Sequence, residues 1–160
     1  MAWTLAGPAV LALGLVAPAV GPPAPPDVPQ ETRYESVTLT GTVVLLTNAL
    51  KALGLAADPE PIAGQVVLKG EDGAITPLLC DTASRALFRD ERLRNRRAEI
   101  QGRRRKGLPY LQVVSLRIDD QGTLRTPEYH CEICKISVRF PQPCPCCQGA
   151  LELRMKPATR

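Results

Sequence analysis

The chain has 160 residues, a formal net charge of +4, and a composition that is 44% hydrophobic but only 4% aromatic. Such a length suits one domain with an appendage, and the hydrophobic residues are numerous enough for a core, which must be largely aliphatic. These values exclude a chain that is disordered throughout, so the sixteen prolines are expected to mark linkers and breaks between elements.

The N-terminal residues 1–26 carry no charge, and residues 9–20 form an apolar run bounded by proline. This run is too short for a membrane span, so no stable span is expected in the mature chain. It is similar to the apolar region of a secretory signal, with residues 17–19 as an Ala-x-Ala-like cleavage site, although no Lys or Arg precedes it. We therefore expect residues 1–30 to be a signal-like segment with a Pro-rich linker. The protein is then exported, to the periplasm or the extracellular space, and a cytoplasmic location is the alternative.

Five segments of the body are predicted to be strands, three from alternation of apolar and polar residues and two, residues 65–69 and 75–79, from their place on either side of a hairpin turn at residues 71–73. They span residues 37–44, 65–69, 75–79, 96–103 and 110–118. The fifth segment is apolar on both faces and is expected to be a central strand, with Val113 on one face and Val114 on the other. Gly41, inside the first segment, indicates a bulge or a bend of a barrel.

Two stretches predict short helices. Residues 82–93 have apolar side chains near helical spacing and follow Asp81, a residue suited to an N-cap. Residues 45–55 fit a helical face more roughly. Five strands with a helix between the third and the fourth is the order of an OB-fold, and residues 36–118 resemble that superfold. The resemblance implies a small β-barrel, closed or nearly closed, which we assign to residues 31–120.

Five of the six cysteines and the single histidine lie between residues 129 and 149. Cys131 and Cys134 form one C-x-x-C pair, and Cys144 and Cys147 form a second. Two such pairs on a short spacer can bring four thiolates onto one tetrahedral metal. Two disulfides, a dithiol redox site, and copper or iron in place of zinc remain alternatives.

Residues near these pairs carry further expectations. His130 directly precedes a ligand, so its side chain is expected to point away from the metal, and Cys146 is a spare thiol. Gly149 is expected to take a positive φ just after the second turn. Cys80, between a strand and a helix start, is interpreted as a buried, inert thiol, because a nucleophile there would lack a base.

Alternating residues 135–140 lie between the two pairs, and residues 150–154 alternate again after them. This layout of strands and cysteine turns resembles a zinc ribbon, and the run Cys-Pro-Cys-Cys-Gln-Gly is similar to a rubredoxin-type knuckle whose glycine sits one place later. The resemblance covers residues 121–156 and implies one closed, structural Zn²⁺ site. The implied ligands are Cys131, Cys134, Cys144 and Cys147. A ribbon by itself identifies no partner.

The whole chain also resembles a class of uncharacterised exported bacterial proteins with a zinc-knuckle tail, which brings no known activity. The expected fold is mainly β: a small OB-like β-barrel with one or two short helices, followed by a C-terminal zinc ribbon.

Between residues 85 and 106 there are ten basic residues and three acidic ones. The segment is expected to bind a polyanion such as nucleic acid or an anionic glycan, and a merely solvated face is the alternative. Residues 103–106 should sit in an exposed loop, and few aromatic residues nearby predict little sequence preference. The candidate contacts are Arg96, Arg97, Arg103, Arg104, Arg105 and Lys106.

Catalytic motifs are lacking in the sequence. It has no Ser-His-Asp set and no Gly-rich phosphate loop, so an enzyme is not expected. The remaining classes are a binding or scaffold protein with a structural zinc site, an exported thiol redox or metal-handling protein that uses the C-terminal cysteines, and an exported structural protein with disulfides.

Overall fold

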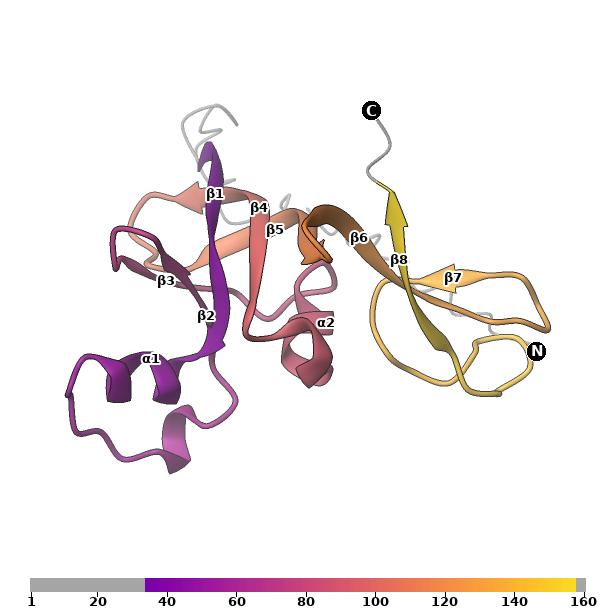
Figure 1. The fold of residues 1–160 in the computed structure, drawn as a ribbon, viewed down its shortest axis with the longest axis horizontal. Coiled ribbons are helices and arrows are strands. Elements are labelled where there is room, and N and C mark those ends of the chain that lie inside the picture. Colours follow the sequence, from indigo (N-terminus) through magenta and orange to yellow (C-terminus); the bar gives the residue numbers. More distant parts are fainter. Residues whose placement is uncertain (1–33, 158–160) are drawn as a thin grey trace, which may run out of the picture.

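The computed structural model describes residues 34–157, so the predicted signal segment and linker lie outside the described residues. This part of the chain is mainly β, with strands β1–β8 in one antiparallel sheet and two short α-helices (Figure 1). The elements are β1 (Tyr34–Leu45), α1 (Leu46–Ala52), the 3₁₀ turn η2 (Glu60–Ile62), β2 (Val66–Gly70), β3 (Ile75–Pro77), α2 (Arg85–Arg89), the 3₁₀ turn η3 (Glu91–Leu93), β4 (Arg96–Arg105), β5 (Leu111–Asp120), β6 (Thr123–His130), β7 (Ser137–Val138) and β8 (Glu152–Pro157).

The first five strands curl into a barrel. They pair in the order β3-β2-β1-β4-β5. A parallel bridge between Leu78 and Leu111 joins the two ends of this row, and the N–H of Leu79 donates to the carbonyl of Leu111 at 3.0 Å. The predicted mainly β fold is confirmed, and the helix α2 lies between the third and fourth strands as expected.

The core of the barrel is aliphatic, as the composition predicts. Buried side chains come from β1, β2, β4 and β5, from the residue after β3, and from α2 and η3; they include Val43, Val66, Leu68, Leu78, Leu87, Leu93, Ile100, Leu111 and Ile118. Gly41 allows β1 to cross β2 closely, because a Cβ there would overlap the carbonyl of Lys69. The pairing of β1 with β2 and β4 runs through Gly41 without a register shift, so this glycine marks a close approach of two strands and not a bulge.

Strand β5 is central, between β4 and β6, as predicted. The prediction that the faces of β5 alternate regularly along its whole length is wrong, however. Val114 forms a β-bulge and has no partner in the β4–β5 ladder. Leu111 and Val113 are buried before the bulge, and Leu116 and Ile118 are buried after it, while Val114 is 46% exposed. One extra residue in a strand reverses which side chains face the core.

Beyond β5 the sheet continues into the C-terminal region, residues 121–157. β6 pairs with β5 only at Thr123, Leu124 and Arg125, and then with β8 and β7. Tyr129 of β6 is buried in the same hydrophobic cluster as the barrel core. A helix that could span a membrane is not found among the described residues.

Candidate metal centre

The first cysteine turn follows directly after β6. The N–H of Cys131 donates to the carbonyl of Ile136, and the N–H of Lys135 donates to the carbonyl of Cys131, both at 2.9 Å. Lys135 has a φ of 58°, the left-handed conformation that closes the turn. The turn also places the N–H of Cys134 3.4 Å from the Cys131 sulfur, a contact that stabilises a thiolate.

The second cysteine turn repeats this backbone pattern. The N–H of Cys144 donates to the carbonyl of Gly149, and the N–H of Gln148 donates to the carbonyl of Cys144, both at 2.9 Å. Gln148, and not Gly149, has the positive φ, at 60°. The expectation for Gly149 is therefore wrong, because the left-handed position is the residue immediately after the second cysteine, and this chain has glutamine there.

The two turns face each other and bring four sulfurs together. The Sγ atoms of Cys131, Cys134, Cys144 and Cys147 all lie within 4.8 Å of one another, and those of Cys131 and Cys147 are 3.6 Å apart. A tetrahedral zinc with Zn–S bonds of about 2.3 Å requires sulfur–sulfur distances of roughly 3.8 Å. The four sulfurs thus have the mutual distances that a tetrahedral metal site requires.

Burial closes one side of the cluster. Cys131 and Cys144 are buried, whereas Cys134 is partly exposed and Cys147 is exposed. Four protein thiolates fill a tetrahedral shell, which is typical of a structural rather than a catalytic site. The donor set is therefore one that could hold zinc or another thiophilic metal.

The electrostatics of the cluster favour an anionic sulfur. The backbone N–H groups of Cys147 and Cys146 point at the Cys144 sulfur and lower the pKa of this thiol to about 6. Hydrogen bonding with the neighbouring thiols, first that of Cys146, raises the pKa of Cys134 above its ordinary value. Because neighbouring thiolates repel one another, the four thiols are not all deprotonated at once unless a bound cation compensates their charge.

The neighbouring residues behave partly as expected. His130 has its Nδ1 3.1 Å from the hydroxyl of Ser137 on β7, so the ring is held by the β6–β7 pair. Cys146 is exposed and is not one of the four clustered cysteines. Cys80 is exposed, so its interpretation as a buried thiol is wrong; the chain leaves the barrel core after Leu78.

The basic segment is more ordered than predicted. β4 runs to Arg105, so residues 103–105 are in a strand and not in an exposed loop. The Arg96 guanidinium donates to the carbonyl of Asp119 and to the carboxylate of Asp120. The guanidinium of Arg97 lies 3.9 Å from the carboxylate of Glu71. Both arginines therefore have acidic neighbours.

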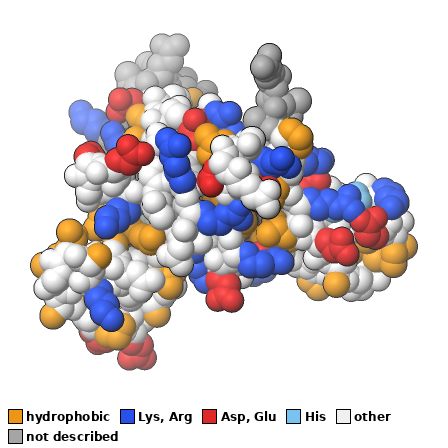
Figure 2. Space-filling view, in the orientation of Figure 1, with side chains coloured by type: hydrophobic (Ala, Val, Ile, Leu, Met, Phe, Trp, Pro, Cys, Tyr) orange, Lys and Arg blue, Asp and Glu red, His pale blue; other side chains and the backbone are white. Residues whose placement is uncertain are grey.

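At the other end of β4 one acidic residue, Glu35, lies opposite Arg104 in the β1–β4 ladder. The Arg103 guanidinium stacks 4.7 Å from the centre of the Tyr34 ring, and Arg105 donates to the side chain of Gln112 at 3.4 Å. Arg104 and Lys106 are exposed. In the face that Figure 2 shows, Lys and Arg side chains are interspersed with acidic ones and do not form one continuous patch.

Two further arginines of the segment contact the C-terminal region. The guanidinium groups of Arg85 and Arg89 lie 4.6 and 5.8 Å from the centre of the Phe140 ring. Arg89 also lies 3.5 Å from the carbonyl of Pro141. These two side chains are therefore used in packing α2 against the loop that precedes the second cysteine turn.

A buried polar contact that the sequence did not indicate joins the same two parts. The hydroxyl of Tyr129 on β6 donates to Oδ2 of Asp90 at 2.7 Å. The Arg92 guanidinium, and then the Tyr129 hydroxyl, hold the pKa of Asp90 at about 2. Burial, and next the Asp90 carboxylate, raise the pKa of Tyr129. No spacing motif links residues 39 positions apart, so only a covarying pair in related sequences could have found this contact.

Comparison with protein-family models, with curated proteins and with solved structures finds no match for this chain. Its class therefore follows from its own geometry. It is a mainly β protein with one antiparallel sheet and a C-terminal cluster of four cysteines that is compatible with a metal site.

Proposed function

We propose that this protein is a non-enzymatic binding or scaffold protein whose C-terminal region is a zinc ribbon. The observation that carries the proposal is the pair of equivalent cysteine turns, whose four sulfurs lie within 4.8 Å of one another. The cofactor is a structural Zn²⁺ held by Cys131, Cys134, Cys144 and Cys147. When bound, the ion cross-links the two cysteine turns, which are otherwise connected by little regular structure because β7 has only two residues. The free energy of zinc binding then contributes to the free energy of folding.

The proposed binding surface is the end of β4 that leads into the β4–β5 turn. Arg104, Arg105 and Lys106 line a hollow of about 450 Å³ together with Tyr34 and one acidic residue, Glu35, so the cations outnumber the carboxylate three to one. The volume is within the range of about 300–1,000 Å³ that is typical of ligand sites. Adjacent cations with an aromatic ring suit a polyanion, either nucleic acid or an anionic glycan. Arg103 contributes to polyanion binding by stacking on Tyr34 and adding a cation there. Arg96 and Arg97 contribute less to polyanion binding, because acidic neighbours offset their charges.

A second candidate function is thiol redox or metal handling by an exported protein. It is favoured by Cys146, an exposed thiol next to Cys147 that is not needed for a four-cysteine site. In that case the metal is exchangeable, or two of the thiols cycle through a disulfide.

The experiment that tests the first proposal measures metal content and free thiols on the unreduced full chain, with two matched variants. One zinc per chain, with six reactive thiols after denaturation in chelator, supports the structural site. Cys134→Ser should lose the zinc, while Cys146→Ser should retain it. Loss of zinc from both variants alike would refute the ligand assignment, and a reversible disulfide or labile copper would favour the second function.

A further inference from the structure

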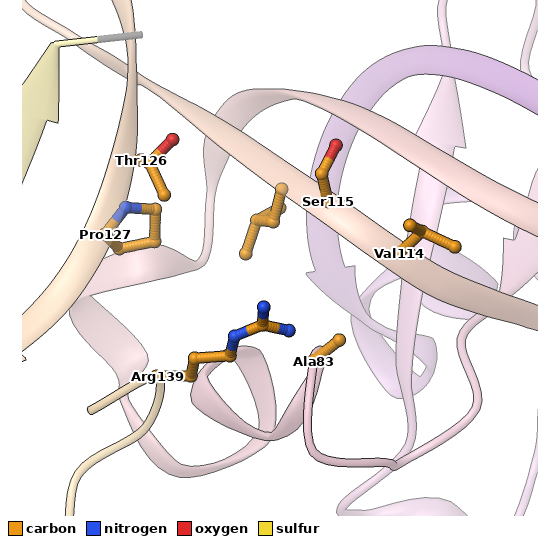
Figure 3. Close-up of a pocket in the computed structure, with 7 residues that line it drawn as sticks. Ala83, Val114, Ser115, Thr126, Pro127 and Arg139 are labelled. Atoms are coloured by element: carbon orange, nitrogen blue, oxygen red, sulfur yellow. The ribbon is translucent and has the colours of Figure 1, made fainter. Parts of the chain in front are cut away.

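A small hollow lies between β5 and β6, on the side of the sheet that α2 and the end of β7 approach (Figure 3). We call it the β5–β6 hollow. Its lining includes Val114 and Leu116 of β5, Thr126 and Pro127 of β6, and Ala83. The sixth main contributor is Arg139, in the bend that follows β7.

The hollow exists because β5 and β6 diverge. The two strands pair from Ile118 onward, toward their connecting turn, and in no other part of the described ladder. Pro127 has no N–H to donate to a neighbouring strand, and at this point β6 pairs with β8 on its other edge. The bulge at Val114 interrupts the regular β4–β5 ladder beside the hollow. The hollow therefore results from the way the backbones of β5 and β6 separate, and not from a small side chain.

The polar character of the hollow comes from Arg139. Figure 3 shows its guanidinium in the middle of the ring of lining residues, near Ala83. The hydroxyl of Ser115 points away from it in the same view and is 3.0 Å from Oε1 of Gln101. Arg139 is an exposed residue at the mouth of the hollow, and no ion pair found among residues 34–157 includes it. The guanidinium is therefore available to an anion.

Size and charge restrict that anion. The volume of the hollow is about 140 Å³, roughly ten times the ~10–15 Å³ that one water requires, and far below the range for nucleotide-sized ligands. One guanidinium matches one carboxylate through two parallel N–H···O bonds. Val114, Leu116 and Ala83 provide apolar contact for a short alkyl chain. Arg85 and Arg89, both stacked on Phe140, add positive potential next to the site.

We propose that the β5–β6 hollow binds a small aliphatic monocarboxylate, with Arg139 as the residue that recognises its carboxylate. The site is separate from the cysteine cluster and from the cationic end of β4, so it adds a small-molecule ligand to the proposed functions. A phosphate dianion fits less well, because one guanidinium and apolar walls leave much of its charge unpaired.

The test is a titration of the zinc-loaded full chain followed by ¹H–¹⁵N NMR at constant ionic strength. The probes are sodium propionate, neutral propionamide of the same shape, and inorganic phosphate. Propionate should shift the amide signals of Val114, Ser115 and Thr126 and the Nε–H of Arg139 in a saturable way. Propionamide should leave these signals unchanged, and phosphate should bind more weakly than propionate. Equal shifts with propionamide, or no saturable shifts with propionate, would overturn the proposal.

Two variants and one control assign the effect to Arg139. Arg139→Gln should weaken propionate binding at least about tenfold, the loss expected for a charge-assisted bidentate contact. Val114→Asp, at an exposed position, should place a competing carboxylate at the hollow and also suppress binding. Arg97→Gln, on β4 and outside the hollow, should bind propionate as the parent chain does. If Arg139→Gln retains the parental affinity, the site assignment is wrong.

Discussion

The hydroxyl of Tyr129 donates to the carboxylate of Asp90 at 2.7 Å, and this bond joins the barrel to the region that carries the cysteines. Tyr129 is 1% exposed and Asp90 is 7% exposed, so both groups are removed from water. Asp90 lies between α2 and η3, while Tyr129 is the residue before His130 at the end of β6. The position of the first cysteine turn is therefore coupled to the barrel through a buried hydrogen bond to a charged group.

Tyr129→Phe tests this coupling. The variant keeps the ring but leaves one lone pair of a buried carboxylate unpaired, so we expect a loss of about 1–2 kcal/mol in the free energy of unfolding. Urea unfolding of the zinc-loaded chain measures this loss. Tyr110→Phe removes the hydroxyl of a 39% exposed tyrosine and should change stability by less than about 0.5 kcal/mol. Equal effects of the two variants would show that the Tyr129 hydroxyl has no special role.

The same carboxylate predicts a pH dependence. In the folded protein the Arg92 and Tyr129 hydrogen bonds lower the pKa of Asp90 from 3.8 to about 2. Because the folded state holds this proton less tightly than the unfolded state, the carboxylate stabilises the fold above pH 4. This contribution, about 2 kcal/mol, is lost as the pH falls from 4 toward 2.

The measurement compares the parent chain with Asp90→Asn in urea at several pH values between 5 and 2. Protonation of the cysteine ligands affects both proteins, so it cancels in the difference between them. The stability gap between the two proteins should narrow as the pH falls. A gap that is constant across this range would contradict the assigned pKa.

Gln148 occupies the left-handed position of the second cysteine turn, at a φ of 60°. Glycine adopts this conformation without the steric cost of a Cβ, which is about 1–2 kcal/mol. Part of that gain is offset by the greater chain entropy of glycine in the unfolded state. We expect Gln148→Gly to stabilise the zinc-loaded chain by about 0.5–1 kcal/mol, measured as a higher urea midpoint. Gln142→Gly, outside both turns, should be destabilising, and stabilisation by both changes would refute the explanation.

The bulge in β5 predicts unequal costs for neighbouring valines. Val113 is 3% exposed and Val114 is 46% exposed. Val113→Ala should cost about 1–2 kcal/mol through lost burial and a small cavity, whereas Val114→Ala should lie within about 0.5 kcal/mol of the parent. Thermal or urea unfolding of both variants checks this. Equal costs would mean that the alternation runs unbroken through the strand.

The cationic end of β4 predicts salt-dependent binding of polyanions. Titration of single-stranded DNA, duplex DNA and heparin at two salt concentrations should show affinity that falls steeply with salt, with a log–log slope of roughly −0.7 to −0.9 per phosphate neutralised for nucleic acid. The variant Arg104→Gln with Lys106→Gln should bind more weakly, since these two cations are exposed. The matched control is Arg85→Gln with Arg89→Gln, which changes two arginines that pack on Phe140. Binding that is insensitive to salt, or lost equally in both double variants, would argue against this surface.

The sequence by itself determined the order of the elements and the identity of the cysteine cluster. Alternation marks β1, β4 and most of β5, which bury mainly one face, and that pattern is local. The C-x-x-C spacing places two sulfurs on one turn for the same local reason. The clustering of Cys131, Cys134, Cys144 and Cys147 was therefore predictable from sequence.

Only the tertiary structure decided which partners the charged and polar side chains have. The bulge at Val114 depends on how β5 pairs with β4, and one extra residue reverses the faces of the strand beyond it. The contact between Asp90 and Tyr129 and the hollow around Arg139 arise where segments distant in the chain meet. Arg85 and Arg103 look alike in the sequence, but one packs on Phe140 and the other on Tyr34. Hydrogen bonds, ion pairs and stacking act over a few ångströms of space, and sequence spacing fixes that distance only within a single turn or strand.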